Sequence, residues 1–336
     1  MTDKLMNLAI IGAGRIAQVH AAAAAGDPRI ALRYVTDIKT EAADDLARRY
    51  GATSADLDTV FDAADIDAVL IASSTDTHAE FLERAARSGK AVLCEKPVAL
   101  DIERTRQAVE VVNAHPITCA LGFNRRHDKQ FEAFHQALQD GRIGTLEPLT
   151  ITSRDPAPPP LAYIKTSGGI FFDMMIHDFD TARWLLDEPI KQVSAHGAVL
   201  IDDQIGNSGD WDTAMATLTT ASGRLCHIEN SRRACYGYDQ RIEALGSQGM
   251  LQANNETETR LRETTPNGQR EEAPKHFFLE RYSQAYAAEL SDLYDAWTSG
   301  GAPKATHEDG YQALRLAEAA TRSAKENRPV QLSEID

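Results

Sequence analysis

The stretch Gly12-Ala13-Gly14-Arg15-Ile16-Ala17 constrains the fold of this chain more than any other feature. It follows a short apolar segment, Leu8 to Ile11, and opens an alanine-rich segment. In a strand–turn–helix unit the first glycine permits the tight turn, the second lets a pyrophosphate approach the backbone, and a small sixth residue lets helix and strand pack. The helix amino terminus supplies N–H groups to the phosphates. We therefore expect a dinucleotide to meet Gly12, Gly14, Arg15 and Ile16.

The first third of the chain alternates short apolar runs with helical segments. We expect strands at residues 8–11, 30–35, 68–72, 91–94 and 117–121, and helices at 16–25, 41–50, 78–88 and 102–113. Alternation with short connections predicts a doubly wound parallel sheet. The strands are uniformly apolar, as expected when helices cover both faces of such a sheet.

The pattern changes after Gly122. The segment Pro156–Pro160 is too rich in proline for regular structure, and residues 192–264 show strands joined by turns such as Ala221-Ser222-Gly223. We expect an α/β chain with a Rossmann domain over 1–122 and an α+β domain with a mostly antiparallel open sheet over 123–336. The last two helices, expected at 279–298 and 307–326, are candidates to pack back on the first domain.

Composition limits the classes of partner. The net charge of −15 over 336 residues argues against nucleic acid and anionic membrane surfaces, which attract basic proteins. No apolar run approaches the length of a membrane span. Cys94, Cys119, Cys226 and Cys235 lie in apolar or strand-like segments and are interpreted as reduced core residues. With no signal peptide recognisable at the start of the sequence, we expect a cytoplasmic protein.

Asp37 closes the expected second strand, 25 residues after Gly12. An acid there accepts hydrogen bonds from the adenosine ribose hydroxyls and repels a 2′-phosphate, which favours NAD over NADP. The alternative role is a cap for the helix that starts near Thr40. Lys39 leaves some tolerance of NADP open.

The polar stretch Ser73 to His78 follows the third expected strand. We expect Ser73, Thr75 and His78 to line the cofactor near the ribose next to the nicotinamide. Capping of the following helix by Asp76 or Thr77 is an equally good explanation for this composition.

Lys96 ends the apolar run Ala91 to Cys94 in the order Glu95-Lys96-Pro97. The carboxyl ends of strands hold ligands in open α/β sheets, and the proline fixes the backbone just past the strand. A lysine before a proline is often a simple loop charge. Beside a dinucleotide fingerprint, however, it predicts a catalytic Lys96 close to the cofactor, with Glu95 in the cofactor site.

Asp173 and His177 are spaced i and i+4, so on one helix both side chains leave the same face. A histidine can take the proton from a substrate hydroxyl while hydride leaves the same carbon, and Asp173 can orient the imidazole or the substrate. We expect no metal, because no third ligand is evident. A purely structural pair remains the alternative.

These motifs together resemble the Gfo/Idh/MocA oxidoreductases, and the resemblance covers almost the whole chain. Gly122–Arg126, Phe172–Asp180, Glu229–Arg233 and Tyr236–Asp239 look more narrowly like the inositol 2-dehydrogenase branch. The resemblance implies that Lys96, Asp173 and His177 form the catalytic set, that NAD is the cofactor, and that Asn124, Arg125, Asp155 and Tyr236 meet the substrate. Asn124 stands where the branch usually has methionine.

The resemblance implies oxidation of a cyclic polyol or sugar, foremost myo-inositol to a 2-keto inosose. Scyllo-inositol, L-glucose or another aldose is the alternative substrate, and a non-catalytic regulator that binds NAD and a sugar is the alternative from another class. The open face of an antiparallel sheet needs cover, and the resemblance implies a homo-oligomer, with a tetramer favoured over a dimer.

Overall fold

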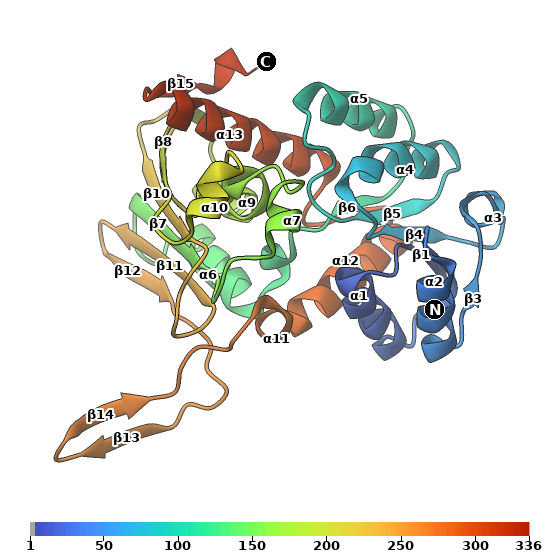
Figure 1. The fold of residues 1–336 in the computed structure, drawn as a ribbon, viewed down its shortest axis with the longest axis horizontal. Coiled ribbons are helices and arrows are strands. Elements are labelled where there is room, and N and C mark those ends of the chain that lie inside the picture. The colour runs from blue at the N-terminus through green and yellow to red at the C-terminus, as the bar shows by residue number, and fades with distance from the viewer. Residues whose placement is uncertain (1–3, 336) are drawn as a thin grey trace. The chain divides into compact units, whose positions relative to one another are not determined.

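The computed structural model describes residues 4–335, and the chain forms two compact units (Figure 1). The first unit runs up to Asp128 and takes in Ser283–Leu314; the second comprises Lys129–Tyr282 and the chain from Arg315 onward. The division therefore differs from the expected boundary after residue 122. The 3-10 helix η1 (Asn124–His127) belongs to the first unit, because His127 Nε2 lies 3.2 Å from the Asp292 carboxylate in that unit.

The first unit is built on a six-stranded parallel sheet with the order β3-β2-β1-β4-β5-β6. Its strands are β1 (Met6–Ile11), β2 (Ile30–Thr36), β3 (Thr53–Ser54), β4 (Ala68–Ile71), β5 (Ala91–Cys94) and β6 (Cys119–Leu121). Its helices include α1 (Arg15–Gly26), α2 (Thr40–Tyr50), α4 (Thr75–Arg87) and α5 (Ile102–Asn113). The order reverses between β1 and β4, the point where such sheets hold a dinucleotide. The expected Rossmann sheet is confirmed.

The segment between β2 and β4 holds two elements that the sequence did not reveal. These are the two-residue strand β3 and the short helix α3 (Leu57–Asp62), which is capped where the Asp56 carboxylate accepts a hydrogen bond from the Thr59 N–H. Elements this short span fewer than two hydrophobic repeats, so periodicity cannot signal them.

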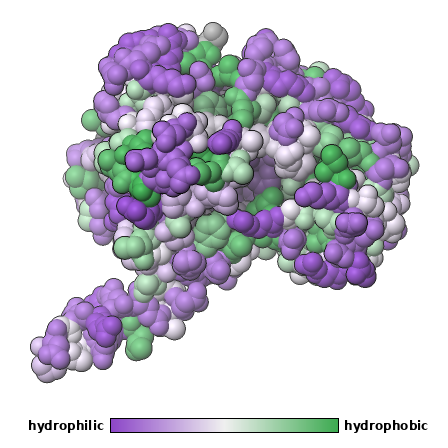
Figure 2. Space-filling model, viewed as in Figure 1, coloured by the Kyte–Doolittle hydropathy of each residue, from purple (hydrophilic) through white to green (hydrophobic). Residues whose placement is uncertain are grey.

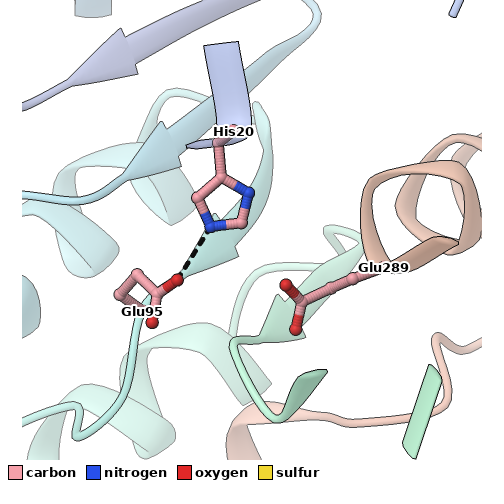
Figure 3. Close-up of side chains that lie close together, drawn as sticks. All are labelled: His20, Glu95 and Glu289. Atoms are coloured by element: carbon pink, nitrogen blue, oxygen red, sulfur yellow. Dashed lines mark hydrogen bonds and ion pairs between the residues drawn. The ribbon is translucent and has the colours of Figure 1, made fainter. Parts of the chain in front are cut away.

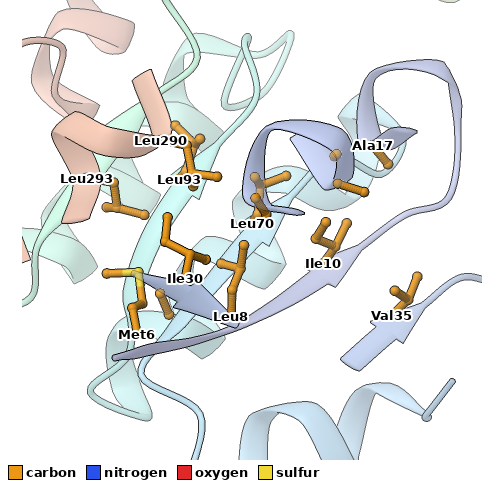
Figure 4. Close-up of a cluster of buried hydrophobic side chains, with 14 of the residues drawn as sticks. Met6, Leu8, Ile10, Ala17, Ile30, Val35, Leu70, Leu93, Leu290 and Leu293 are labelled. Atoms are coloured by element: carbon orange, nitrogen blue, oxygen red, sulfur yellow. The ribbon is translucent and has the colours of Figure 1, made fainter. Parts of the chain in front are cut away.

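The helix α12 (Ser283–Ser299) completes the core of the first unit although it comes late in the chain. Leu290 and Leu293 are buried with Met6, Leu8 and Leu93 of the sheet in one apolar cluster (Figure 4). The next helix, α13 (His307–Glu326), has its first residues in the first unit and the remainder in the second. Burial of these leucines explains why a carboxyl-terminal helix returns to the amino-terminal sheet.

The second unit contains a seven-stranded sheet with the order β12-β11-β7-β10-β9-β8-β15. The strands are β7 (Leu146–Arg154), β8 (Ile190–Ala198), β9 (Thr213–Thr220), β10 (Leu225–Ser231), β11 (Asp239–Gly246), β12 (Gly249–Ala253) and β15 (Val330–Gln331). Every neighbouring pair is antiparallel except β7 with β10. The mostly antiparallel sheet is therefore confirmed. Helices of this unit are α6 (Lys129–Gln139), α7 (Leu161–Ile164), α8 (Ile170–Asp173), α9 (Met175–Leu186), α10 (Asp203–Asn207) and α11 (Phe278–Arg281).

The two faces of this sheet differ in burial. Residues such as Ile151 on β7 and Ile228 on β10 are buried on the face that α9 covers. The opposite face carries Met215, Leu225, Leu245 and Met250, each between 42% and 49% exposed. Register places all four on one face, because Leu245 pairs with Met250 and Met215 with Glu229, which lies on the Leu225 side of β10.

A hairpin of β13 (Arg262–Thr265) and β14 (Gly268–Glu271) extends away from the seven-stranded sheet, and its strand residues are all exposed (Figure 1). Most of its surface is hydrophilic in Figure 2. Within residues 4–335, no helix has the length and apolar character needed to cross a membrane. The cysteines are free, and three are buried as expected; Cys235 is exposed, so its assignment to the core was wrong.

Candidate active site

The glycine-rich turn between β1 and α1 has the geometry that a pyrophosphate requires. Gly12 adopts a φ of 109°, and a Cβ there would lie 2.4 Å from the Ala72 carbonyl oxygen, so only glycine fits. A Cβ on Gly14 would meet nothing within 4 Å. Gly14 is also the N-cap of α1, without a side-chain cap and without an acid in the first turn. The backbone at Gly14 is thus open to a close approach at a positive helix end that no side chain caps, which fits the phosphates of NAD.

Asp37 lies beside this turn at the end of β2. Its Oδ2 accepts a hydrogen bond of 2.7 Å from the Ala13 N–H, and its Oδ1 accepts one of 2.8 Å from the Lys39 N–H. These amides fix the carboxylate while leaving lone pairs for a ribose diol. The N-cap of α2 is Lys39, and it has no side-chain cap, so the alternative role of Asp37 as a helix cap is not seen.

Ser73 and Thr75 follow β4, and their loop is tied together locally. The Ser73 and Thr77 hydroxyls lie 2.7 Å apart, and Ser74 is the N-cap of α4 without a side-chain cap, so capping by Asp76 or Thr77 does not occur. His78 is buried, with Nδ1 2.8 Å from the Pro97 carbonyl oxygen and Nε2 3.1 Å from that of Ser73. The ring therefore links the loops after β4 and β5, and a contribution of His78 to the cofactor site would come through this positioning.

Lys96 follows β5 directly and is half-buried, and the Lys96–Pro97 peptide is cis. The preceding Glu95 is buried, its N–H donates to the Ile71 carbonyl, and its side chain accepts from His20 at 2.8 Å. Asn124 and Arg125 follow β6 in η1 and are also buried. The candidate residues of the first unit therefore all follow the carboxyl ends of β1, β2, β4, β5 and β6.

Asp173 and His177 do not share one continuous helix. Asp173 ends α8, Met174 separates the two helices, and His177 lies in the first turn of α9. The expectation of a single helix was therefore wrong. Asp173 and His177 remain four residues apart, and both are half-buried.

The Asp173 carboxylate is held by two side chains that sequence reasoning did not single out. Its Oδ1 accepts a hydrogen bond of 2.7 Å from the Tyr163 hydroxyl, and its Oδ2 lies 3.3 Å from Nη1 of Arg232. Arg232 is fully buried, and its Nη2 lies 3.3 Å from Asp210, which in turn accepts from the Ile170 N–H at the start of α8. Arg232 thus forms an ion pair with Asp173 and fixes this carboxylate at the end of α8.

Tyr236 and Asp155 lie in the same unit. The Tyr236 hydroxyl donates to Asp239 at 2.6 Å and accepts from Arg154 at 2.7 Å, while Arg154 also contacts Glu229. Asp155 directly follows β7, and its carbonyl accepts a hydrogen bond from the Ala234 N–H at 2.6 Å. The residues 156–160 that follow form neither helix nor strand, as expected. Tyr236 is 44% exposed, and its hydroxyl lies in a network of fixed donors and acceptors.

Asp239 shows how this network treats charge. Burial alone would raise the pKa of Asp239, but hydrogen bonds from Arg241, Tyr236 and Asn255 hold it below the usual range. The carboxylate therefore stays ionised at neutral pH and accepts hydrogen bonds only.

The missed residues differ in the signal they left. Arg232 lies in the Glu229–Arg233 stretch that carried the family resemblance, so its motif was visible although its role was not. Tyr163 follows the proline-rich segment, and Asp210 lies in a short loop before β9. Neither has a pattern around it, and only the fold brings both to Asp173.

Comparison with known proteins covers nearly the whole chain. Residues 6–123 match the model of the oxidoreductase family with an NAD-binding Rossmann fold, and residues 131–252 match the model of the GFO/IDH/MocA C-terminal domain. The inositol 2-dehydrogenase of Rhizobium meliloti (strain 1021) is 48% identical over 324 residues, which is 96% of this chain and 98% of that protein.

Two solved structures extend the comparison. A myo-inositol dehydrogenase from Corynebacterium glutamicum is 42% identical with a TM-score of 0.93, over 98% of this chain and 99% of that one. A scyllo-inositol dehydrogenase from Lactobacillus casei, solved with bound NAD(H) and scyllo-inositol, is 29% identical with a TM-score of 0.91, over 98% of this chain and 100% of that one. The similarity therefore spans both units of the fold.

Proposed function

Because the chain belongs to the Gfo/Idh/MocA family of oxidoreductases, we propose that it oxidises myo-inositol to the 2-keto inosose with NAD. The observation that carries the substrate is the 48% identity to an inositol 2-dehydrogenase over almost the full length of both proteins. The Tyr236–Asp239–Arg154 network supports it, because fixed donors and acceptors match a ring that bears hydroxyls at every carbon.

The catalytic set is Lys96, Asp173 and His177. The glycine-rich turn and Asp37 would hold the phosphates and ribose of NAD, which would supply the acceptor for the hydride from the alcohol carbon. His177 takes the proton of the reacting hydroxyl as general base. The Lys96 ammonium donates a hydrogen bond to the oxygen as negative charge develops there. Asp173, which is paired with Arg232, orients the substrate and the imidazole.

Formation of NADH on mixing the protein, NAD and myo-inositol tests this function. Lys96→Met and His177→Ala should each lower kcat by about 10²–10⁴-fold, the usual effect of losing one acid or base group. Both variants should keep the fold and the affinity for NAD, measured by circular dichroism and by quenching of intrinsic fluorescence. Turnover near the wild-type rate in either variant would contradict the assignment of that residue.

The open face of the seven-stranded sheet supports a homo-oligomer. Met215, Leu225, Leu245 and Met250 expose apolar surface on that face, among polar strand residues. A second copy of the same face is its best match, because such a mixed surface packs on itself around a two-fold axis. Two such pairs would give the tetramer. Sedimentation at micromolar concentration should show an oligomer that Met215→Glu with Leu225→Glu weakens, and a monomeric wild type would contradict it.

The free thiols of Cys94, Cys119 and Cys226 support a reducing compartment such as the cytoplasm. Fractionation of cells that express the protein should recover it with cytoplasmic markers.

A further inference from the structure

A buried polar cluster in the first unit has no assigned role. It joins His20 of α1, Glu95 after β5 and Glu289 of α12 (Figure 3). One ligand atom from each of the three side chains lies within 4.8 Å of the other two. His20 and Glu289 are fully buried, and Glu95 is 9% exposed. The cluster thus combines two carboxylates and one imidazole away from solvent. Its member Glu95 directly precedes Lys96 in the sequence.

Glu289 is unusual within this cluster. Neither of its carboxylate oxygens has a hydrogen-bond partner in the described structure, although the side chain points toward His20 and Glu95 (Figure 3). Its buried neighbours on α12 include Tyr286, Leu290 and Leu293, and Asp292 lies three residues further along the helix. An ionised carboxylate in such surroundings would cost several kcal/mol, whereas a carboxylic acid would cost far less and would gain a donor.

The charged groups that pack around Glu289 also favour its protonated form. Burial raises the pKa of Glu289 well above its usual value, and the negative charges of Glu95 and Asp292 raise it further. Three further titratable groups lie at this cluster: His20 from α1, whose Nε2 lies 2.8 Å from Glu95 Oε1, Tyr286 from α12, whose ring packs edge-on against His20, and His127 from η1, which lies 3.2 Å from Asp292. Each histidine is thus engaged with another acid, and neither neutralises Glu289.

A metal ion fits the cluster less well than a proton. His20 Nε2 and Glu95 Oε1 are 2.8 Å apart, which is the distance of an N–H···O hydrogen bond. Two ligands of a tetrahedral ion with bonds of about 2.0–2.1 Å would lie roughly 3.3 Å apart. The imidazole therefore already donates to Glu95, and the remaining carboxylate needs a proton.

We propose that Glu289 is a positioning residue that stays protonated at neutral pH and donates a hydrogen bond toward Glu95. Its separation from the other two side chains is one that a single bridging water spans. Glu289 and His20 then hold the Glu95 carboxylate from two helices, and Glu95 holds the end of β5 that continues into Lys96. The effect on catalysis rests on the proposed role of Lys96, whereas the protonation of Glu289 does not.

Infrared difference spectra of the holoenzyme test protonation without reference to activity. At neutral pH the wild type should show the carbonyl band of a buried carboxylic acid, and Glu289→Gln should lose it. Glu80→Gln, at an exposed glutamate of α4, is the matched control and should leave the band unchanged. Absence of the band in the wild type, or a stoichiometric divalent metal that Glu289→Gln removes, would overturn the proposal.

The pH dependence of unfolding gives a second readout that is independent of activity. The folded state keeps the Glu289 proton above the ordinary value of 4.5, whereas the unfolded chain releases it. The folding constant of the wild type should therefore fall relative to that of Glu289→Gln as pH rises above this ordinary value, by up to about tenfold per pH unit. A ratio that stays constant with pH would contradict a protonated Glu289.

The kinetic test asks whether the cluster positions Lys96. Glu289→Leu should lower kcat by about 10–100-fold, because small displacements of a catalytic group are costly, with little change in the KM for NAD. Glu289→Gln, which keeps a neutral donor, should retain at least about tenfold more kcat than Glu289→Leu. Equal losses in both variants, with the infrared band present, would refute the positioning role alone and leave both the protonation and the proposed dehydrogenase activity standing.

Discussion

The carboxylates at the two candidate regions are held in different ways. In the first unit, Asp37 is bound by main-chain N–H groups and Glu95 by an imidazole. In the second unit, arginines hold the acids: Arg232 lies between Asp173 and Asp210, and Arg154 contacts Glu229 and Asp239. The carboxylates of the first region are thus held by hydrogen bonds from amide and imidazole N–H groups, and those of the second region by arginine cations.

This difference has a consequence for chemistry. An arginine-paired carboxylate stays ionised over the whole physiological range, so it offers substrate hydroxyls a fixed acceptor. A carboxylate held by amides keeps more of its accepting capacity for a ribose diol. The two regions should therefore respond differently when a partner is removed or the pH is changed.

The largest effect should follow loss of the buried cation. Arg232→Met leaves Asp173 and Asp210 facing each other without compensation, and removing one partner of a buried ion pair typically costs about 3–5 kcal/mol of unfolding free energy. Chemical denaturation measures this cost. Activity should fall as well, because Asp173 would lose the group that fixes it.

Arg232→Lys is the matched control for that change. It keeps the charge but lacks the two separate N–H arms that reach Asp173 and Asp210, so it should fall between wild type and Arg232→Met. If the free energy of unfolding of Arg232→Met lies within about 1 kcal/mol of the wild-type value, the arginine does not hold the two carboxylates as described.

An intermediate effect should appear on acidification. Because hydrogen bonds hold the pKa of Asp239 below its ordinary value of 3.8, its stabilisation is fully present above 3.8 and is lost as pH falls from there through the lower pKa of the folded state. Asp239→Asn should therefore lose about 1–3 kcal/mol at neutral pH and less below about pH 4. Asp58→Asn, at an exposed ion pair, is the control and should change little. A deficit of Asp239→Asn that is equal at both pH values would contradict this account.

The smallest effect on the fold should come from the amide-held carboxylate. Asp37→Ala should lower kcat/KM for NAD and relieve repulsion of the NADP 2′-phosphate. The ratio of kcat/KM with NAD to kcat/KM with NADP should therefore fall by about 10–100-fold. Asp37→Asn keeps one acceptor oxygen for the Ala13 N–H and separates lost charge from lost geometry. A wild-type protein that already prefers NADP would refute this role of Asp37.

The two units also differ in how far sequence alone predicts them. The strands of the first unit are short, apolar and separated by helical repeats, so β1, β2, β4, β5 and β6 were anticipated nearly in place. The sequence named the helix of Leu290 and Leu293 only as a candidate to pack on that sheet. Apolar periodicity shows that a helix has a buried face, but it does not show which sheet covers that face. In the second unit the parallel pairing of β7 with β10 has no local signal, since β7 lies far from β10 along the chain.

The candidate site shows the same limit. Lys96, Asp173 and His177 stand out because their spacing matches a family pattern, yet the helix between Asp173 and His177 is broken at Met174. Partners such as Tyr163 and Asp210 reach Asp173 and Arg232 only through the fold. Local spacing therefore indicates the candidate residues, and tertiary packing determines which side chains hold them.

The most direct test of the proposed function is kcat/KM with NAD for myo-inositol, scyllo-inositol, D-glucose and L-glucose under one set of conditions. A site that pairs each hydroxyl leaves buried polar groups unpaired when one is inverted or missing, which sets the ranking. We expect an inositol to give the highest value, with myo-inositol first; Asn124, buried in η1, adds a donor and an acceptor that favour scyllo-inositol as the second substrate. A higher kcat/KM for D-glucose than for both inositols would contradict the proposed function.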